Sequence, residues 1–190
     1  MMHSERELFS KQLRIQTAEA HERLDHSFLL SKIAGPSLTL DEYKLIVSRH
    51  AQSFFRVENA LFKAGGEALF TEYFYSSRLP GLKKDLQTLG LPEPGLKDNG
   101  NSAQTSIATA VGMFYVLHGS CLGGQMIAKH LRGRMPEDAL NFYGGSSAHL
   151  PAWAEFKEKI DSEQNTLSLS QAVAGARLAF ETFSEIFQEA

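Results

Sequence analysis

The chain has 190 residues, of which 43% are hydrophobic, and a formal net charge of −3 at pH 7. This length and apolar content suffice for one hydrophobic core, so we expect a single domain over residues 1–190. The slight negative charge argues against nucleic acid as a partner, because nucleic-acid binding normally appears as a basic surface. The one cysteine, Cys121, excludes an intrachain disulfide and any multi-cysteine metal site.

The N-terminal segment is charged where a secretory signal would need an uninterrupted apolar run, at Glu5, Arg6, Glu7, Lys11 and Arg14. No stretch approaches the roughly 20 consecutive apolar residues that a membrane-spanning helix requires. We therefore expect a cytoplasmic location and no membrane partner.

Helical patterns recur along the chain, and strand patterns are nearly absent. Ser4 and Glu7 form a capping box, and the helix after it has an inward-facing stripe of Leu13, Thr17, His21, Leu24 and Phe28. A second capping box predicts a long helix from 39 to about 65. The pattern then predicts helices over 67–78 and around 82–89, a loop over 90–101, a helix over 103–132 that Gly133 caps, a turn or short helix over 136–148, and helices over 151–160 and 170–188. We expect an all-α helical bundle.

The predicted helix over 103–132 contains three glycines, Gly119, Gly123 and Gly124. Each interior glycine costs about 1 kcal/mol of helix stability relative to alanine. Gly119 and Gly123 lie one turn apart, so either a second helix or a flat ligand can approach the backbone there. A straight helix of this length would be about 45 Å long, and we expect a kink at the glycines instead.

The N-terminal helix carries a possible metal ligand. A lone histidine on an apolar stripe is usually a core residue, but Asp25 lies four residues after His21 and can orient one of its ring nitrogens, which leaves the other free for a metal. Arg14 lies two turns earlier and can pair with a carboxylate of the same ligand. The combination suits a planar iron cofactor that carries propionates.

These two segments resemble the heme oxygenases. The resemblance rests on two motifs, in the order and at the separation typical of that family: Leu13-Arg14, Thr17, His21 and Asp25, and Gly119-Ser120-Cys121-Leu122-Gly123-Gly124-Gln125. It implies a bundle in which heme lies between a proximal N-terminal helix and a kinked distal helix. It also implies that His21 is the axial iron ligand and that Asp25 is its hydrogen-bond partner.

The resemblance further assigns the catalytic face and the residues around the cofactor. The distal face would be formed by Gly119, Ser120, Gly123 and Gly124. The heme contacts would include Arg14, Tyr115, Lys157, Arg177 and Phe180, with Phe183 as a further candidate. Animal members carry an aspartate where this chain has Ser120, and a propionate-pairing lysine where it has Ala18.

The implied reaction is cleavage of heme to biliverdin, carbon monoxide and Fe²⁺, dependent on O2 and on electrons from outside. A reductase or ferredoxin would supply the electrons, since no motif here binds a flavin or nicotinamide. Its docking surface would be the cations that follow the glycines: Lys129, His130, Arg132 and Arg134. A bilin acceptor such as a phytochrome is a possible further partner.

Several alternatives stay open on the sequence alone. A heme carrier or sensor would bind through His21 without turnover, and an interaction module would bind no heme. A helical hydrolase of the thiaminase-like group would need Cys121 in its pocket, yet on a continuous helix Cys121 faces away from the glycines. His118 is also poorly aimed at a ligand on the glycines, although a kink could bring it closer; as a second iron ligand it would block oxygen binding.

Overall fold

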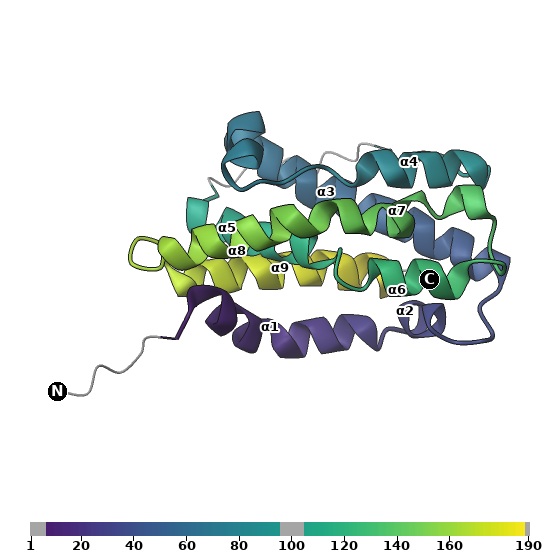
Figure 1. Cartoon of the computed structure of the whole chain (residues 1–190), viewed down its shortest axis with the longest axis horizontal. Helices are drawn as coiled ribbons and strands as arrows, with labels where there is room; N and C mark the ends of the chain where they lie inside the picture. The colour runs from purple at the N-terminus through teal and green to yellow at the C-terminus, as the bar shows by residue number, and fades with distance from the viewer. Residues whose placement is uncertain (1–6, 96–104, 189–190) are drawn as a thin grey trace.

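The computed structural model describes residues 7–95 and 105–188, and within these ranges the regular elements are all helical. The α-helices are α1 (Phe9–Asp25), α2 (Phe28–Ile33), α3 (Leu40–Glu72), α4 (Leu79–Thr88), α5 (Ile107–Gly119), α6 (Gly124–Leu131), α7 (Asn141–Gly144), α8 (Leu150–Ser162) and α9 (Leu169–Gln188). Two 3₁₀ turns, η1 (Glu137–Ala139) and η2 (Gly145–His149), flank α7. The expected all-α bundle is confirmed (Figure 1).

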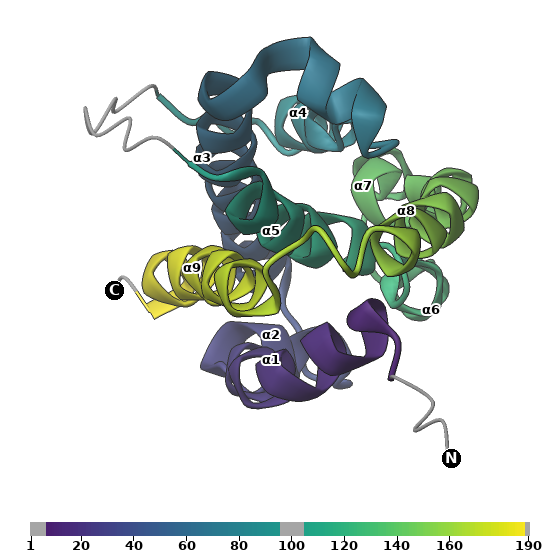
Figure 2. The same ribbon diagram turned by 90° about the vertical axis from the view of Figure 1, so that its left-hand side faces the viewer.

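Helix α5 lies at the centre of the bundle, with α3, α8 and α9 around it (Figure 2). It is buried on nearly all sides, as expected of a helix that is apolar around its whole circumference. The segment Ile107–Leu131 is long and apolar enough to cross a membrane by composition, but 61% of its most apolar stretch is buried inside the protein. Its hydropathy is therefore accounted for by its place in the core.

Two glycines bring α5 and α9 into backbone contact. A Cβ atom added to Gly112 would lie 1.8 Å from the Ala172 carbonyl oxygen, and one added to Gly175 would lie 1.9 Å from the Thr109 carbonyl oxygen. Both distances are far below van der Waals contact, so neither position tolerates a side chain without separating the helices. The two glycines thus set the distance between these central helices.

Helix α1 lies along one edge of the bundle and packs mainly against α9 and α8 (Figure 1). Its first turn has no side-chain cap of its own, because the residue before the helix is Leu8. Asp161 of α8 replaces that cap, since its carboxylate accepts hydrogen bonds from the Ser10 backbone N–H (2.7 Å) and from the Ser10 hydroxyl (2.8 Å). This pair fastens the start of α1 to α8.

The predicted start and stripe of the first helix need correction. Ser4 lies outside the described residues, the helix begins at Phe9, and Glu7 pairs with Lys11 instead. Leu13, Thr17 and Leu24 are buried as predicted. Phe28 is not on this stripe, because the chain turns after Asp25, and Phe28 begins α2 with 73% of its surface exposed.

The second predicted capping box is confirmed, as Thr39 and Glu42 exchange both hydrogen bonds at the start of α3. The predicted stop near residue 65 is a kink at Gly66, where φ is +61°. The helix predicted over 67–78 is the continuation of α3 and ends earlier, at Glu72. Pro80 lies in the first turn of α4, where its missing N–H costs no hydrogen bond.

The predicted kink in the glycine-bearing helix is confirmed. Helix α5 ends at Gly119, residues 120–123 form a turn, and α6 begins at Gly124. Gly133 follows α6 with φ of +73°, as expected of a glycine just past a helix C-terminus. Of the predicted loop over 90–101, residues 96–101 lie outside the described ranges. The remaining C-terminal helices lie close to their predicted ranges.

Candidate functional site

A cavity of about 1310 Å³ lies between α1 on one side and the junction of α5 and α6 on the other. This volume exceeds the range of about 300–1,000 Å³ that is typical of sites for small ligands. The predicted residues that line it are Arg14, His21, Asp25, Tyr115, Gly119, Ser120, Gly123, Lys157, Phe180 and Phe183. Two motifs nearly 100 residues apart in sequence therefore meet at one large cavity.

His21 and Asp25 form the α1 side of this cavity. The imidazole Nδ1 lies 3.0 Å from the Asp25 Oδ2 atom, and 63% of the histidine side chain is exposed because it borders the cavity. The hydrogen bond that the His21 ring donates to the Asp25 carboxylate is the main reason that the pKa of His21 is raised above its usual value, against the opposing effect of desolvation. The ring also meets Phe180 edge-on, with centroids 5.7 Å apart. Nδ1 is therefore committed to the carboxylate, and Nε2 is the nitrogen left for a ligand.

Gly119 and Gly123 form bare backbone on the facing side. A Cβ atom added to Gly119 would meet no atom within 4 Å, and one added to Gly123 would meet only the Ile127 side chain, at 3.9 Å. Close helix packing, the simplest explanation for glycines in a helix, therefore does not apply to these two. Their missing side chains keep space open in the cavity.

Gly124 differs from its two neighbours. A Cβ atom there would lie 1.9 Å from the Ser146 Oγ atom, so Gly124 is a packing glycine between α6 and η2. It is buried and does not line the cavity. The resemblance placed Gly124 on one face with Gly119, but the turn over 120–123 separates α5 from α6 and directs Gly124 away from the cavity.

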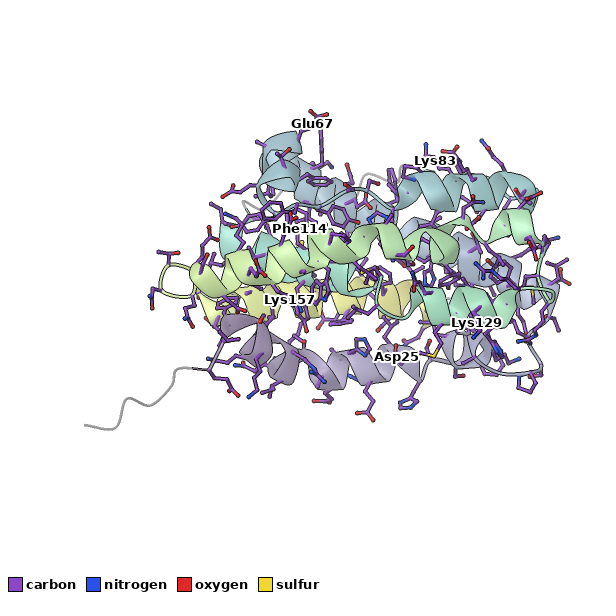
Figure 3. The ribbon with its side chains drawn as sticks, viewed as in Figure 1. Asp25, Glu67, Lys83, Phe114, Lys129 and Lys157 are labelled. Carbon is purple, nitrogen blue, oxygen red and sulfur yellow. The ribbon has the colours of Figure 1, made fainter. Side chains whose placement is uncertain are left out.

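Three polar groups with a predicted ligand role surround the rest of the cavity. Arg14 reaches it from α1, Tyr115 from α5, and Lys157 from α8, where the ammonium group lies 5.3 Å from the centre of the Trp153 ring. Figure 3 shows Lys157 on α8 and Lys129 on α6 at different positions along the long axis of the molecule. Arg177 lies elsewhere, because its guanidinium donates to the Gln16 carbonyl outside the cavity.

Comparison with known proteins identifies the family to which this chain belongs. The family model of heme oxygenase matches residues 7–189. A heme oxygenase from Xanthomonas campestris pv. campestris (strain 8004) is 30% identical over 158 residues, which cover 82% of this chain and 94% of that protein. The chain belongs to the heme oxygenase family.

Solved heme oxygenase structures share the fold at low sequence identity. The NO- and CO-bound enzyme from Neisseria meningitidis superimposes with a TM-score of 0.73 at 21% identity, covering 95% of this chain and 90% of that one. Heme oxygenase 2 from Chlamydomonas reinhardtii gives a TM-score of 0.70 at 18% identity, and the match covers 96% of this chain and 97% of that one. Heme oxygenase-1 from Synechocystis sp. PCC6803, solved with heme, gives a TM-score of 0.68 at 16% identity, and the match covers 95% of this chain and 91% of that one. The resemblance inferred from the two motifs is thus confirmed for the family and for the fold.

Ser120, which borders the cavity, is held by Arg78, a residue that no sequence motif marked. The Arg78 Nη1 atom donates to the Ser120 hydroxyl at 2.6 Å, and that hydroxyl donates to the Leu117 carbonyl at 2.6 Å. The one proton of the hydroxyl is therefore used within the protein. Toward the cavity Ser120 can only accept a hydrogen bond.

Arg78 is itself buried and makes two further side-chain hydrogen bonds. Its Nη2 atom donates to the Phe142 carbonyl (2.9 Å) and to the Ser146 hydroxyl (2.7 Å), and its guanidinium carbon lies 3.9 Å from the centre of the Phe142 ring. The backbone around Phe142 is fixed in turn by Asp85, whose carboxylate accepts from the Phe142 N–H at 2.9 Å. No sequence pattern marks Arg78, which follows two serines and precedes Leu79 and Pro80.

Two other candidates from the distal helix point away from the cavity. His118 is buried, with Nε2 at 3.0 Å from the Tyr73 carbonyl oxygen and its ring stacked on Phe156 at 4.7 Å. Burial lowers its pKa to about 4. Cys121 is also buried, and neither residue lines the cavity. The structure therefore gives no support to a second axial histidine or to a cysteine nucleophile in this site.

The cations beyond the glycines lie on and just after α6. Lys129, His130 and Arg132 are exposed, and Arg134 pairs with His130 and donates to the Gly35 carbonyl at 2.9 Å. His130 also lines the cavity. Among the described residues, no cluster of three or more His, Cys, Asp or Glu could hold a metal ion.

Proposed function

We propose that this chain cleaves heme to biliverdin, carbon monoxide and Fe²⁺, using O2 and external electrons, with His21 as the axial iron ligand. One observation carries the proposal: a carboxylate-oriented histidine and two unobstructed glycines border the same cavity from opposite helices. Membership of the heme oxygenase family supports heme as the substrate. The cavity is large enough for a macrocycle.

On the α1 side, Asp25 would keep the proton of His21 on Nδ1 and direct Nε2 at the iron. A metal-bound histidine commonly donates its other ring N–H to a carboxylate, which fixes the ring orientation and makes it a more basic ligand. A single neutral imidazole leaves the opposite side of the iron available for O2. Phe180, which meets the His21 ring edge-on, would limit its rotation.

On the facing side, Gly119 and Gly123 would let the macrocycle approach the backbone closely. Ser120 would accept a hydrogen bond from water in the cavity, since its own proton is bound to the Leu117 carbonyl. No carboxylate from α5 or α6 lines the cavity among the described residues. Protons would therefore arrive through water, and the protein would act by orienting the substrate and by excluding competing reactions.

The propionates would be held by Arg14 and Lys157, with the Tyr115 hydroxyl as a further donor. Arginine suits this role because its planar fork matches a carboxylate, and lysine adds a second positive charge. Arg177 is left out of this set, because it donates to Gln16 outside the cavity.

A reductase or ferredoxin would supply electrons at the surface formed by Lys129, His130, Arg132 and Arg134. Reversing the charge of Arg132, which is exposed, should slow reduction by an acidic donor more at low than at high salt, because screening weakens interactions between exposed charges. A bilin-binding protein such as a phytochrome would be a compatible acceptor of the product.

The test is reconstitution with hemin, aerobic reduction, and chromatography of the product. Loss of the Soret band with the appearance of biliverdin supports the proposal, and the isomer identifies the carbon attacked. A Soret band that persists under reductant and O2 would indicate a carrier or sensor instead. A matched His21→Ala variant should lose the axial ligand and regain it with added imidazole, whereas unchanged coordination would rule out His21.

A further inference from the structure

A row of ring side chains leads from the cavity into the core between α3, α5 and α8, and the proposed function does not use it. Trp153 of α8, the one tryptophan of the chain, lines the cavity. Its ring lies 6.3 Å from that of His118 on α5, and the His118 ring lies 5.1 Å from that of Tyr75, which follows α3. Phe156 stacks on both Trp153 (5.9 Å) and His118 (4.7 Å). These four residues, here called the aromatic row, are in continuous ring contact.

The two ends of the aromatic row are the side chains in it that give up an electron most easily. Indole and phenol are readily oxidised by one electron, whereas imidazole and phenyl rings resist oxidation, so His118 and Phe156 serve only as the contact between Trp153 and Tyr75. Burial lowers the pKa of His118 to about 4, so this ring adds no positive charge that would oppose an oxidised neighbour. The ammonium group of Lys157 lies 5.3 Å from the centre of the Trp153 ring, and in the proposed function a propionate balances its charge.

Tyr75 has a base for the proton that a phenol loses when it is oxidised. Its hydroxyl donates to the Glu58 carboxylate at 2.8 Å, and both side chains are buried. Burial raises the pKa of Glu58, which makes its carboxylate a better proton acceptor than an exposed one. The chain neighbours of Tyr75, Phe74 and Ser76, are exposed, so this phenol lies directly beneath the surface.

The two tyrosines that line the cavity, Tyr115 and Tyr143, have no comparable base. The Tyr143 hydroxyl lies 3.4 Å from Nε2 of His50, whose pKa burial lowers to about 3, so this imidazole accepts a proton poorly. No carboxylate in the described part of the chain accepts a hydrogen bond from Tyr115. An oxidised site is therefore better stabilised at the far end of the aromatic row, on Tyr75, than on a phenol in the cavity wall.

We propose that the aromatic row carries one-electron oxidation from the heme cavity to Tyr75, and so spares the cavity wall when an organic hydroperoxide reacts there. The inference rests on the proposed function, because it needs heme in the cavity.

The electrons and protons of this reaction balance. The hydroperoxide takes up two electrons and two protons, its O–O bond breaks, and it leaves as an alcohol and water. Each electron comes from Trp153, which regains it from Tyr75 while the phenolic proton passes to Glu58. A soluble thiol then returns one electron and one proton to Tyr75, and Glu58 releases its proton to solvent. Two thiols, oxidised to a disulfide, complete the reduction of one hydroperoxide.

The test is freeze-quench electron paramagnetic resonance of the ferric heme complex after addition of cumene hydroperoxide, which supplies the oxidation without O2 or an electron donor. The wild type should give a tyrosyl radical signal, and Tyr75→Phe and Trp153→Phe should each lose most of it. Tyr43→Phe is the control, because Tyr43 is a buried tyrosine outside the aromatic row that donates to the Ala139 carbonyl at 2.6 Å. An unchanged signal in Tyr75→Phe or Trp153→Phe, or an equal loss in Tyr43→Phe, would overturn the inference.

A measurement on the wild type covers the case in which a variant fails to fold. After excess cumene hydroperoxide without thiol, peptide mass mapping should find oxidised Trp153 and Tyr75 before oxidised Tyr115 or Tyr143, and the reverse order would count against the aromatic row. The heme spectrum and biliverdin formation are recorded on the same protein. If both are normal and no radical forms on Tyr75, the inference alone fails. If heme does not bind through His21, the proposed function fails first, and the inference falls with it.

Discussion

The guanidinium group of Arg78 and the hydroxyl of Ser120 are joined by a 2.6 Å hydrogen bond, and this bond decides what the serine can do in the cavity. Because the hydroxyl proton already goes to the Leu117 carbonyl, Ser120 is fixed as an acceptor. Arg78 lies just before α4 and does not line the cavity. The orientation of the Ser120 hydroxyl beside the glycines therefore depends on a residue outside the cavity lining.

Replacing Arg78 should lower the stability of the fold. Arg78→Met removes the donor of the Ser120, Ser146 and Phe142 contacts and leaves the nearby Glu58 without its positive neighbour, so we expect a loss of about 3–5 kcal/mol in unfolding free energy. Arg78→Lys keeps the charge but cannot reach all three acceptors, and should be intermediate. Urea denaturation measures both variants, and a loss below about 1 kcal/mol for Arg78→Met would contradict the described network.

The glycines should separate cleanly into two groups when each is changed to alanine. Gly119→Ala meets nothing within 4 Å, so the heme-free protein should keep or gain stability, by up to about 1 kcal/mol, while heme affinity falls. Gly112→Ala would drive a methyl group into the Ala172 carbonyl and should lose more than about 3 kcal/mol. Thermal unfolding and heme titration of both variants check this. Unchanged heme binding in Gly119→Ala would show that no ligand approaches there.

The His21–Asp25 pair predicts opposite pH dependences for folding and for heme binding. Asp25 raises the pKa of His21, so its contribution to the stability of the heme-free protein is complete below pH 6.5 and is lost as pH rises through the raised pKa. Iron needs a neutral Nε2, so heme affinity should fall as pH drops through the same pKa. In Asp25→Asn the pKa of His21 is no longer raised, so the fall in heme affinity should occur at lower pH. Heme affinity at pH 8–9 should drop about 10- to 100-fold. Heme titrations between pH 5 and 9 test this. If heme affinity falls at the same pH in Asp25→Asn as in the wild type, Asp25 does not control the protonation of His21.

Arg14 and Arg177 offer a matched pair for the propionate contacts. Arg14→Leu should weaken heme binding by about 3- to 10-fold, with a smaller effect at high salt, because it removes a cation that borders the cavity. Arg177→Leu should have little effect, since this guanidinium donates to the Gln16 carbonyl outside the cavity. Dissociation constants for hemin, measured at two salt concentrations for both variants, test this difference. Equal effects in the two variants would mean that Arg14 has no specific contact.

The proximal half of the site could be predicted from the sequence because it is local. The four-residue spacing of His21 and Asp25 fixes their contact on any α-helix, so no tertiary information is needed. The glycine cluster likewise predicted a break in a helix too long for the domain. Phe28 was misplaced because the turn after Asp25 has no glycine or proline to mark it.

The distal half could be predicted only in part, because it depends on tertiary structure. Gly119 and Gly124 look alike in the sequence, and only the turn between α5 and α6 sends one toward the cavity and the other toward Ser146. Arg78 lies just before α4, far from Ser120 in the sequence, and reaches Ser120 while also contacting α7. No periodicity or spacing connects residues so far apart along the chain, so these partners appear only in three dimensions.

The glycine contact between α5 and α9 has a consequence for how a disc as wide as heme can be loaded. Gly119 lies on α5 and Phe180 on α9, and the backbones of these two helices are in contact at Gly112 and Gly175. The two helices therefore cannot separate without breaking this close contact. Helix α1, by contrast, is held to α8 at its start by the bonds between Ser10 and Asp161. Any widening of the cavity would have to come from displacement of α1, and His21 would then move with that helix.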